Sequence, residues 1–431
     1  MPSEPVSLPA DLNGWLAYLE QLHPKSIALG LERVNEVKSR LALEPSFPII
    51  TVAGTNGKGS TCAMLERVYT EAGYSVACYT SPHLLRYNER VRVDREEASD
   101  AALCTAFAAV EAARQLTPLT YFEFGTLAAL WHFVHTQVAV AILEVGLGGR
   151  LDAVNAFCPA CTVITSIDLD HMDYLGNSRA SIGREKAGVF RRSVTALCGD
   201  PQPPETVTDY AKAIEADFRQ IGRDFGFTRK PDGWDFYMGD VQMKGLPMPA
   251  LAGDFQLFNA SCALGAITSL QAALPVKPQH IARGLREVVL AGRFQRISGN
   301  PQIILDVAHN PHAALALAEN LRKSETAGCT LAVFAMLADK DIAGVVQALG
   351  ATIERWFVAD IHSARGASAR LLAEKIQQTI GHVKVECHDQ VSLAFNAACH
   401  AAGENDRIIV FGSFYTVADV MQMLPVAHLG D

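Results

Sequence analysis

Short apolar runs alternate with amphipathic segments along most of the chain. In the first half the runs are FPIITVAG (47–54), YSVACYT (74–80), VAVAILEVG (138–146) and CTVITSI (161–167). In the second half they are PQIILDVA (301–308), CTLAVFAML (329–337), RWFVADI (355–361), VKVECH (383–388) and DRIIVFGS (406–413). Nearly continuous apolar strands separated by helical patterns are typical of parallel sheets covered on both faces. The pattern therefore predicts an α/β fold.

Two segments interrupt this alternation. Residues 225–248 predict short antiparallel strands with turns at Asp232-Gly233 and Gly239-Asp240, forming a small β patch. Two helical segments follow, and the stretch AGRFQRISGNPQ at 291–302 then precedes a new series of strands and helices. We therefore expect a first domain at 1–291 that carries the β patch, and a second α/β domain at 292–431.

Composition and charge exclude several classes of protein. Of the 431 residues, 49% are hydrophobic and 19% are charged, as in soluble globular proteins. A net charge of −9 leaves no broad basic surface for nucleic acid. The N-terminal segment MPSEPVSLPADLNGW lacks the basic and apolar regions of an export signal, and no apolar run approaches the ~20 residues of a bilayer span. We expect a cytoplasmic monomer that binds neither membranes nor nucleic acid.

The ten cysteines follow no regular spacing. In a long chain with no evident export signal, they are expected to be reduced. Cys158 and Cys161 form one CxxC pair, but no second pair or nearby His pair completes a zinc site. We interpret the pair as part of the packing at the start of a strand.

The segment PIITVAGTNGKGST (48–61) combines a strand, three glycines and the start of a helix. It departs from the strict phosphate-loop pattern, because Val52 replaces the first glycine and Gly59 separates Lys58 from Ser60. Backbone N–H groups and the helix dipole bind phosphate in this context. Lys58 would then supply a positive charge and Ser60 a hydroxyl near a metal ion. The alternative is a glycine-rich turn whose lysine is solvated, and the segment alone does not decide.

Three further polar side chains lie on or beyond predicted strands in the same half of the chain. Ser81 follows YSVACYT, Glu144 lies within VAVAILEVG, and His171 follows CTVITSI. Open parallel sheets bind ligands beyond the carboxyl ends of their strands, so these side chains are expected at one edge. A hydroxyl, a carboxylate and an imidazole, completed by phosphate oxygens and water, suit Mg²⁺. Taken alone, His171 is more typical of a structural histidine.

The second half of the chain repeats this arrangement. Asp306 and His309, in DVAHNPHAA, follow the predicted strand PQIIL, and Ser413 follows DRIIVF. Arg293 lies in AGRF at the expected domain boundary, and Asn259 lies shortly before it. These side chains are therefore candidates for ligand contacts at a sheet edge of the second domain or near the boundary.

Nine motifs occur in order along the chain. They are AGTNGKGS, TSPHLLRYNERVRV, LTYFEFGTLAAL, EVGLGGRLDAVN, TSIDLDHMDYLG, SIGREKAGVF, GRFQ, DVAHNPHAA and GSFYTVADV. In this order they resemble the folylpolyglutamate synthase/dihydrofolate synthase family of the Mur ligase superfamily, over residues 15–420. The loop of that family reads Gly-Thr-Asn-Gly-Lys-Gly-Ser/Thr, so Val52 and Gly59 fit its pattern. The resemblance implies a P-loop NTPase-like parallel-sheet domain followed by a Rossmann-like α/β domain.

The resemblance also implies an activity. Members of this family are ATP-dependent amide ligases that phosphorylate a substrate carboxylate, after which the amino group of L-glutamate attacks the acyl phosphate. The expected substrates are dihydropteroate, which gives dihydrofolate, and reduced folates, which give polyglutamates. The expected cofactors are ATP and one or two Mg²⁺ ions, with Mg²⁺ and Lys58 offsetting charge on the transferring phosphoryl group.

Roles follow residue by residue from the matched motifs. Lys58, Lys186 and His309 correspond to catalytic positions, and Lys186 to a carbamylated lysine that orients Mg²⁺, although alone it is typical of a salt bridge on an amphipathic helix. Ser81, Glu144 and His171 correspond to metal ligands. Positions that resemble ATP contacts are Thr55, Asn56, Gly57, Lys58, Gly59, Ser60, Asn259, Arg293 and Asp306. Positions that resemble substrate contacts are Thr120, Tyr121, Phe122, Glu123, Asp152, Ala153 and Ser413.

One position departs from the family pattern, and three alternatives stay open. Ala28 stands where some bifunctional members carry an acid, which weakens the expected contacts to the pterin. A peptidoglycan Mur ligase shares the chemistry but generally places a UDP-sugar domain before the loop, and only 53 residues precede Gly54 here. A nucleotide-switched binding protein would not need Glu144, His171 and Lys186. A monofunctional folylpolyglutamate synthase would use only the reduced folates.

Overall fold

The computed structural model describes residues 8–25, 27–324 and 326–425. By its internal contacts the chain divides into two compact units, Met1–Met248 with Phe258–Val288 and Pro249–Leu257 with Val289–Asp431. The sequence predicts a domain boundary at residue 291, and the structure divides the chain after Val288. Residues 249–257 also belong to the second unit, although they precede that boundary.

The first unit contains, in its described residues, a sheet of eight strands in the order β4-β3-β2-β5-β1-β6-β7-β8. Its strands are β1 (Ile49–Ala53), β2 (Val76–Tyr79), β3 (Val91–Val93), β4 (Glu96–Glu97), β5 (Val140–Glu144), β6 (Cys161–Ile164), β7 (Thr195–Cys198) and β8 (Asp217–Gln220). The six strands β2, β5, β1, β6, β7 and β8 run parallel to their neighbours. At one edge, β3 pairs antiparallel with β2, and β4 pairs antiparallel with β3. Every residue of β1 and β5 is buried, which explains why these strands are apolar without alternation.

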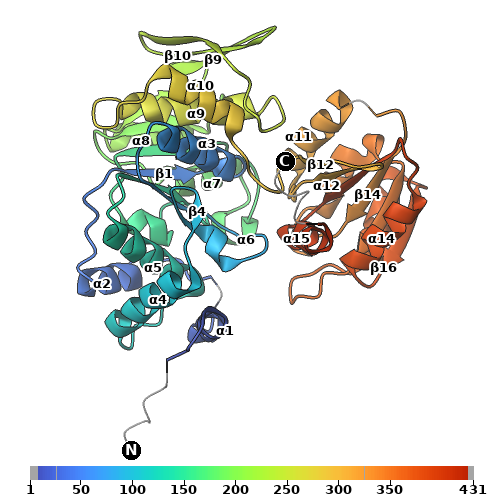
Figure 1. The fold of residues 1–431 in the computed structure, drawn as a ribbon, viewed down its shortest axis with the longest axis horizontal. Helices are drawn as coiled ribbons and strands as arrows, with labels where there is room; N and C mark the ends of the chain where they lie inside the picture. The colour runs from blue at the N-terminus through green and yellow to red at the C-terminus, as the bar shows by residue number, and fades with distance from the viewer. Residues whose placement is uncertain (1–7, 26, 325, 426–431) are drawn as a thin grey trace, which may run out of the picture. The chain divides into compact units, whose positions relative to one another are not determined.

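Helices cover both faces of this sheet. They are α1 (Leu12–Leu22), α2 (Glu32–Arg40), α3 (Lys58–Glu71), α4 (Asp100–Arg114), α5 (Tyr121–Thr136), α6 (Met172–Leu175), α7 (Arg179–Ala187), α8 (Glu205–Ala213), α9 (Gln256–Ser269) and α10 (Pro278–Glu287), with the 3₁₀ turns η1 (Tyr87–Arg90) and η2 (Ala153–Ala156). Figure 1 shows α2, α4 and α5 on one side of β1, and α3, α9 and α10 on the other. The predicted parallel sheet with two covered faces is confirmed.

The predicted β patch is also confirmed. Strands β9 (Phe225–Lys230), β10 (Gly233–Met238) and β11 (Val241–Leu246) form an antiparallel sheet. Trp234 is buried in it and donates a hydrogen bond from Nε1 to the carbonyl oxygen of Pro247, 2.8 Å away. The connections between the strands fall at the two predicted turns.

The second unit contains, in its described residues, a sheet of six strands in the order β12-β13-β17-β14-β15-β16. Its strands are β12 (Gln295–Ile297), β13 (Gln302–Leu305), β14 (Thr330–Phe334), β15 (Arg355–Ala359), β16 (Lys384–His388) and β17 (Arg407–Phe411), and only β12 is antiparallel to its neighbour. Its helices are α11 (Pro311–Lys323), α12 (Ile342–Leu349), α13 (Ala369–Ile380), α14 (Val391–Ala401) and α15 (Phe414–Met423), with the 3₁₀ turn η3 (Gly350–Thr352). Apolar side chains of α11, α12 and α13 form one core with the strands. The predicted Rossmann-like arrangement is confirmed.

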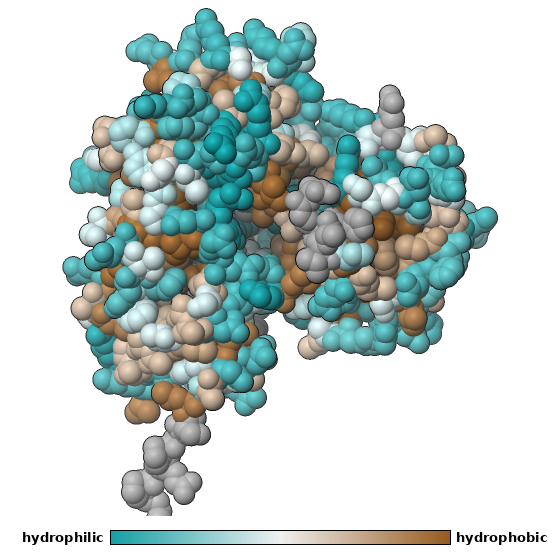
Figure 2. Space-filling model, in the orientation of Figure 1, coloured by the Kyte–Doolittle hydropathy of each residue, from teal (hydrophilic) through white to brown (hydrophobic). Residues whose placement is uncertain are grey.

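On the visible face of each unit, hydrophilic residues cover most of the surface, and apolar residues form smaller patches among the hydrophilic ones (Figure 2). In the part of the chain that the structure describes, no helix has the length and apolar character needed to cross a membrane.

Candidate active site

The glycine loop between β1 and α3 is shaped by two close approaches. Gly57 has a φ of 87°, in the left-handed region, and a methyl group added there would overlap the side-chain oxygen of Asn259. Gly54 has a φ of 149°, and a methyl group there would overlap the hydroxyl of Thr165. Glycine is therefore required by both the backbone conformation and the packing. Asn259, on α9, lies directly against the loop.

Hydrogen bonds tie the loop to the segment that follows β6. The amide of Thr55 donates to the carbonyl oxygen of Ser166 at 2.8 Å, and its hydroxyl donates to the carbonyl oxygen of Asp168 at 3.0 Å. The hydroxyl of Thr165 donates to the carbonyl oxygen of Asn56 at 2.6 Å, and the amide of Asn56 donates to the hydroxyl of Ser166 at 3.0 Å. The loop is thus held in one shape by a neighbouring strand end.

The residues of this loop that are predicted to bind phosphate lie at the start of α3. The Lys58 ammonium donates to the carbonyl oxygens of Gly54 at 3.0 Å and Thr55 at 3.2 Å, so it is folded back over the loop. Ser60 is buried in the first turn of α3. Unpaired N–H groups of a first helical turn and a lysine ammonium form an anion site.

Two of the predicted metal ligands lie side by side. Strands β2 and β5 are parallel neighbours, so Ser81, after β2, and Glu144, at the end of β5, meet at one edge. The amide of Ser81 donates to Glu144 Oε2 at 3.3 Å, and Glu144 is buried. Their oxygens are of the type that Mg²⁺ prefers.

His171 lies on the loop beyond β6, where its φ is 50°. Its amide donates to Asp170 Oδ1 at 2.8 Å, and its Nε2 is 3.9 Å from Asp170 Oδ2. Among the described residues, no three His, Cys, Asp or Glu side chains gather closely enough to hold a metal ion. A metal here would therefore take further ligands from hydroxyls, phosphate oxygens or a modified side chain.

Lys186 is buried in the last turn of α7. Burial and then the positive charge of Lys58 lower the pKa of its amino group to about 7, while Asp170 and Asp152 act in the opposite direction. These interactions place Lys186 near the phosphate loop and the His171 segment. At neutral pH a large fraction of this amine is uncharged and nucleophilic.

Asp152 is a second buried charge in this region. It accepts hydrogen bonds from the amides of Leu147 at 2.9 Å and Val154 at 3.0 Å, and it caps η2, whose first residue is the buried Ala153. Burial raises the pKa of Asp152 to about 7, against these hydrogen bonds and the charge of Lys58. Two strongly shifted groups beside one loop are typical of a functional site.

The start of α5 is fixed by a capping box. Thr120 caps the helix, and the amide of Thr120 donates to Glu123 Oε2 at 2.8 Å. Glu123 is buried and pairs with Arg33 at 2.7 Å. The carboxylate of Glu123 therefore orients the residues around it, and its expected contact with substrate stays a prediction.

Two aromatic side chains follow that cap. The Phe122 ring lies against Gly146, just beyond β5, and 5.9 Å from the ring of Tyr79. The Arg90 guanidinium lies 5.5 Å from the ring centre of Tyr121. Both aromatic side chains are half-buried, so each keeps exposed surface at this edge of the sheet.

A histidine neighbours this aromatic pair. Arg90 donates from Nε to His83 Nδ1 at 2.8 Å. Burial, and then the charge of Arg90, lower the pKa of His83 to about 4. His83 is therefore neutral at physiological pH.

In the second unit, the predicted residues meet beyond β13 and β17. Asp306 accepts hydrogen bonds from the amides of Phe294 and Ala308, both at 2.8 Å, and burial raises the pKa of its carboxyl despite the charge of Arg293. The Arg293 guanidinium lies 5.2 Å from the ring centre of Phe414.

His309 and Ser413 complete this group. His309 Nδ1 donates to the carbonyl oxygen of Val307 at 2.8 Å, and its ring centre lies 6.3 Å from that of Phe414. Ser413 is buried and caps α15 through its hydroxyl, which accepts from the amide of Tyr415. These side chains form a polar cluster at the carboxyl edge of the sheet, where α/β folds bind ligands.

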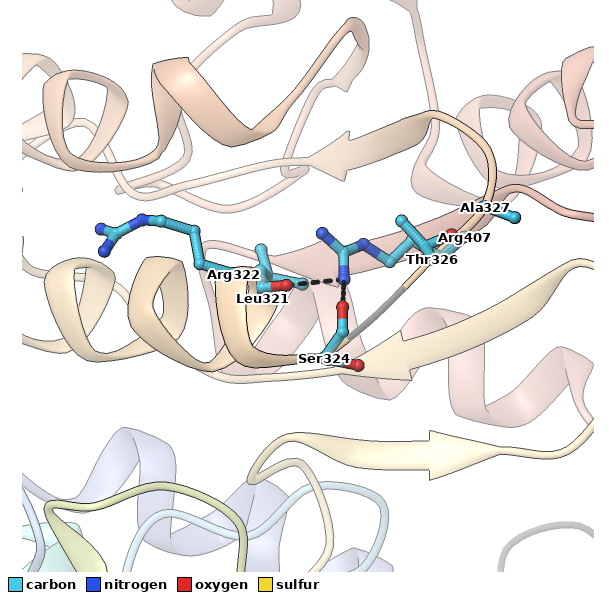
Figure 3. Close-up of a pocket in the computed structure, with 6 residues that line it drawn as sticks. All are labelled: Leu321, Arg322, Ser324, Thr326, Ala327 and Arg407. Carbon is cyan, nitrogen blue, oxygen red and sulfur yellow. Dashed lines mark hydrogen bonds between the residues drawn. The ribbon is translucent and has the colours of Figure 1, made fainter.

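A hollow of about 540 Å³ lies at the opposite edge of the same sheet (Figure 3). It is lined by Leu321, Arg322, Ser324, Thr326, Ala327 and Arg407. Arg407, the first residue of β17, donates from Nη1 to the carbonyl oxygens of Leu321 at 2.8 Å and Ser324 at 2.7 Å (Figure 3). We interpret Arg407 as a cap for the last carbonyl groups of α11, and the hollow is separate from the polar cluster.

Sequence reasoning singled out neither Asp170 nor Arg33. Asp170 raises the pKa of Lys186, but the motif TSIDLDHMDYLG contains two other aspartates, Asp168 and Asp173, and the sequence does not distinguish among the three. Arg33 lies 90 residues from Glu123, its partner. No local pattern distinguishes either residue, since each depends on a tertiary contact.

Comparisons with known proteins agree with this geometry. The Mur ligase middle domain matches residues 52–267, and the Mur ligase, glutamate ligase domain matches residues 292–414. The dihydrofolate synthase/folylpolyglutamate synthase of Escherichia coli (strain K12) is 44% identical over 420 residues, 97% of either chain.

Solved structures give the same result. E. coli FolC in complex with DHPP and ADP has a TM-score of 0.92 at 44% identity, covering 97% of this chain and 99% of that one. A bifunctional folylpolyglutamate synthase/dihydrofolate synthase with Mn, AMPPNP and L-glutamate bound has a TM-score of 0.89 at 44% identity, with the same coverage.

The fold and the site define an ATP-dependent ligase of the Mur type. The chain belongs to the Mur ligase family and, within it, to the dihydrofolate synthase/folylpolyglutamate synthase family. The resemblance drawn from the nine motifs is confirmed.

Proposed function

We propose that this enzyme is bifunctional: it adds L-glutamate to dihydropteroate, giving dihydrofolate, and to reduced folates, giving polyglutamates. One observation carries the proposal. A buried lysine of shifted pKa, Lys186, lies near Lys58 of the phosphate loop and near Asp152. The similarity to a bifunctional relative extends over 97% of the chain, which supports both activities.

ATP binds at the glycine loop in this proposal. The N–H groups of residues 57–60 and the Lys58 ammonium would receive the phosphates, while Thr55 and Asn56 hold the shape of the loop through their bonds to Ser166. Asn259, which lies against Gly57, would contact the nucleotide beside them. Arg293 and Asp306 contribute further ATP contacts. A cation and N–H groups stabilise charge on the transferring phosphoryl group, which accounts for much of catalysis in such transfers.

Ser81, Glu144 and His171 would hold Mg²⁺, and their hydroxyl, carboxylate and imidazole fit that role. A divalent ion held by these residues would supply positive charge against the phosphates of the nucleotide. We propose that Lys186 is carbamylated. The lone pair of the neutral amine attacks CO₂, an N–C bond forms, and one proton is released, which leaves an anion at a buried position beside a cationic lysine.

The reaction then proceeds in two transfers. The substrate carboxylate attacks the γ-phosphorus of ATP and ADP leaves, giving an acyl phosphate. The amino group of L-glutamate attacks the acyl carbon, the amine loses a proton and phosphate leaves with the C–O bonding pair. We assign His309 and Ser413 to the glutamate end; the carbonyl oxygen of Val307 accepts a hydrogen bond from His309 Nδ1 and fixes the ring.

The pterin end lies around the start of α5 in this proposal. Phe122 offers a half-buried ring for stacking on a flat heterocycle, and Tyr121 lies beside it. Asp152 offers a carboxyl group that is close to half protonated at neutral pH, so it can donate or accept a hydrogen bond. Thr120, Glu123 and Ala153 set the backbone around these side chains.

The test is a product assay with purified protein, ATP, Mg²⁺ and L-glutamate. We expect dihydrofolate from dihydropteroate and glutamylated product from tetrahydrofolate, each detected by mass. Lys58→Ala is the control, and it should abolish both products. Activity with tetrahydrofolate alone would make the enzyme a monofunctional folylpolyglutamate synthase. ATP hydrolysis without a glutamate-containing product would contradict the proposal as a whole.

A further inference from the structure

One arginine outside the assigned site connects three of its supporting segments. Arg92 lies on β3, and its Nε and Nη2 donate to Glu66 on α3, at 3.0 Å to Oε1 and 2.8 Å to Oε2. Its Nη1 donates to the Thr80 hydroxyl at 3.2 Å and to the Glu89 carbonyl oxygen at 2.6 Å. We call these hydrogen bonds from Arg92 to Glu66, Thr80 and Glu89 the fork. A planar guanidinium is suited to such an arrangement, because its donors point in fixed directions.

This pair is largely removed from water. The side chain of Glu66 is 6% exposed and that of Arg92 is 17% exposed. Burying two charges costs solvation free energy, so a buried ion pair commonly adds little to stability over an apolar pair of the same size. The geometry that the fork imposes is therefore a stronger reason for its presence than stability.

Both ends of the fork reach residues of the phosphate and metal region. Thr80 directly precedes Ser81, whose amide is held by Glu144. Glu66 lies on α3, whose first turn carries Lys58 and Ser60. The fork thus spans from the helix of the phosphate loop to the turn that carries the serine.

We propose that Arg92 and Glu66 are positioning residues that fix the Ser81 turn relative to α3. The inference rests on the proposed function in taking Ser81 as a metal ligand. Without the fork, Thr80 and Ser81 lose their side-chain link to α3, and the metal–nucleotide complex binds a looser site. Supporting residues of metal sites typically change metal affinity by about 10–100-fold when they are replaced.

The experiment compares four variants of the full chain. Arg92→Lys keeps the charge opposite Glu66, but its donors all lie on one nitrogen and cannot span all three partners. Thr80→Val removes one contact of the fork and leaves the ion pair intact. Glu66→Gln removes the bidentate acceptor. Arg67→Met is the matched control, since Arg67 is next to Glu66 on α3 and pairs instead with Glu71 and Glu287.

Two readouts separate positioning from folding. The first is the apparent activation constant for Mg²⁺ in the ligase assay, with kcat, KM for L-glutamate and Tm. The second is binding of Mn²⁺ in the presence of AMPPNP, measured by electron paramagnetic resonance, which needs no acceptor substrate.

We expect Arg92→Lys and Glu66→Gln to raise both metal constants by about 10-fold, and Thr80→Val by about 3-fold. KM for L-glutamate should stay within about 2-fold, since the fork does not touch the second unit's residues assigned to glutamate. Arg67→Met should leave both metal constants unchanged.

Each other outcome has one meaning. A fall in Tm with unchanged metal constants in Arg92→Lys and Thr80→Val would overturn the inference and leave a purely structural ion pair. An equal rise in Arg67→Met would also overturn it. If the wild type forms no glutamate-containing product, the proposed function fails, and the Mn²⁺–AMPPNP constants alone decide the inference. No Mn²⁺ binding by the wild type with AMPPNP would overturn both.

Discussion

At the scale of single residues, the main feature of the candidate site is a lysine that is less basic than usual. Lys186 is buried, and the neighbouring Lys58 adds repulsion, so its pKa falls to about 7 from 10.5. A lysine exposed to water is almost fully protonated at pH 7 and reacts poorly with CO₂. Burial therefore makes this amine reactive, at a cost in stability that a carbamate beside Lys58 would offset.

The first prediction is that turnover depends on CO₂ through Lys186. Lys186→Ala should lower kcat by about 10²-fold or more with little change in fold, since the group that orients the metal ion is lost. Wild type depleted of CO₂ and bicarbonate should lose activity and regain it on addition of bicarbonate, measured as the initial rate.

The rate of that recovery should rise with pH. With a pKa of about 7, the neutral fraction of Lys186 grows from about one-tenth at pH 6 to about nine-tenths at pH 8, so reactivation at the same concentration of dissolved CO₂ should be about 10-fold faster at pH 8. Lys212→Ala, at an exposed position of α8, is the control and should behave as wild type. Turnover that is indifferent to bicarbonate would exclude the carbamate.

At the scale of elements, each apolar run named in the sequence corresponds to a strand. Strands β1, β5, β14 and β17 are buried on both faces, so most of their residues are apolar and do not alternate with polar ones. No run was named for the interior strand β7 or for the parallel edge strand β8. The antiparallel edge strands β3, β4 and β12 were not predicted either. They are two or three residues long and partly exposed, and they pair antiparallel through contacts that leave no period in the sequence.

The candidate site, like the strands, was predictable where it follows from the order of parallel strands and not where it depends on tertiary contacts. The ends of parallel strands come together by topology, which brings Ser81 and Glu144 side by side as expected. The family resemblance predicted Asn259 as an ATP contact, but not its position against Gly57, because some 200 residues separate them and no local pattern links them. Arg92 is a similar case, since an arginine in a strand shows nothing of the helix with which it pairs.

The second prediction concerns the turn into α3. Gly57→Ala should raise KM for ATP by about 10-fold, because the added methyl group displaces Asn259 and distorts the loop. A left-handed backbone conformation alone costs about 1–2 kcal/mol for a residue with a Cβ. Gly73, after α3, has the same φ of 87° and no atom within 4 Å of an added methyl group.

Gly73→Ala therefore isolates the backbone cost from the contact. It should lower the stability by that backbone cost and leave KM for ATP unchanged, measured by thermal unfolding and initial rates. Asn259→Ala combined with Gly57→Ala should recover part of the lost stability. Equal KM values in the two glycine variants would contradict a role for the Asn259 contact.

At the scale of the whole molecule, the described residues place one polar cluster in each of the two units. The first cluster surrounds the glycine loop, Lys186 and Asp152, and the second surrounds Arg293, Asp306 and His309. Each lies beyond the carboxyl ends of its own parallel strands, where such sheets bind ligands. The proposed reaction requires both, because ATP contacts are assigned to residues of both units.

The last prediction tests that assignment through ligand-induced stability. A ligand that binds only the folded protein adds about 2.7 kcal/mol at 100 times its Kd. AMPPNP with Mg²⁺ should therefore raise Tm by about 3–5 °C, measured by calorimetry. Arg293→Ala should reduce this shift at a fixed ligand concentration, because the guanidinium that lies over Phe414 is lost. Arg296→Ala removes a nearby exposed arginine and should keep the full shift. If the shift in Tm is undiminished in Arg293→Ala, Arg293 does not contact ATP. If the shift is lost in Lys58→Ala and kept in Arg293→Ala, the nucleotide binds only at the glycine loop.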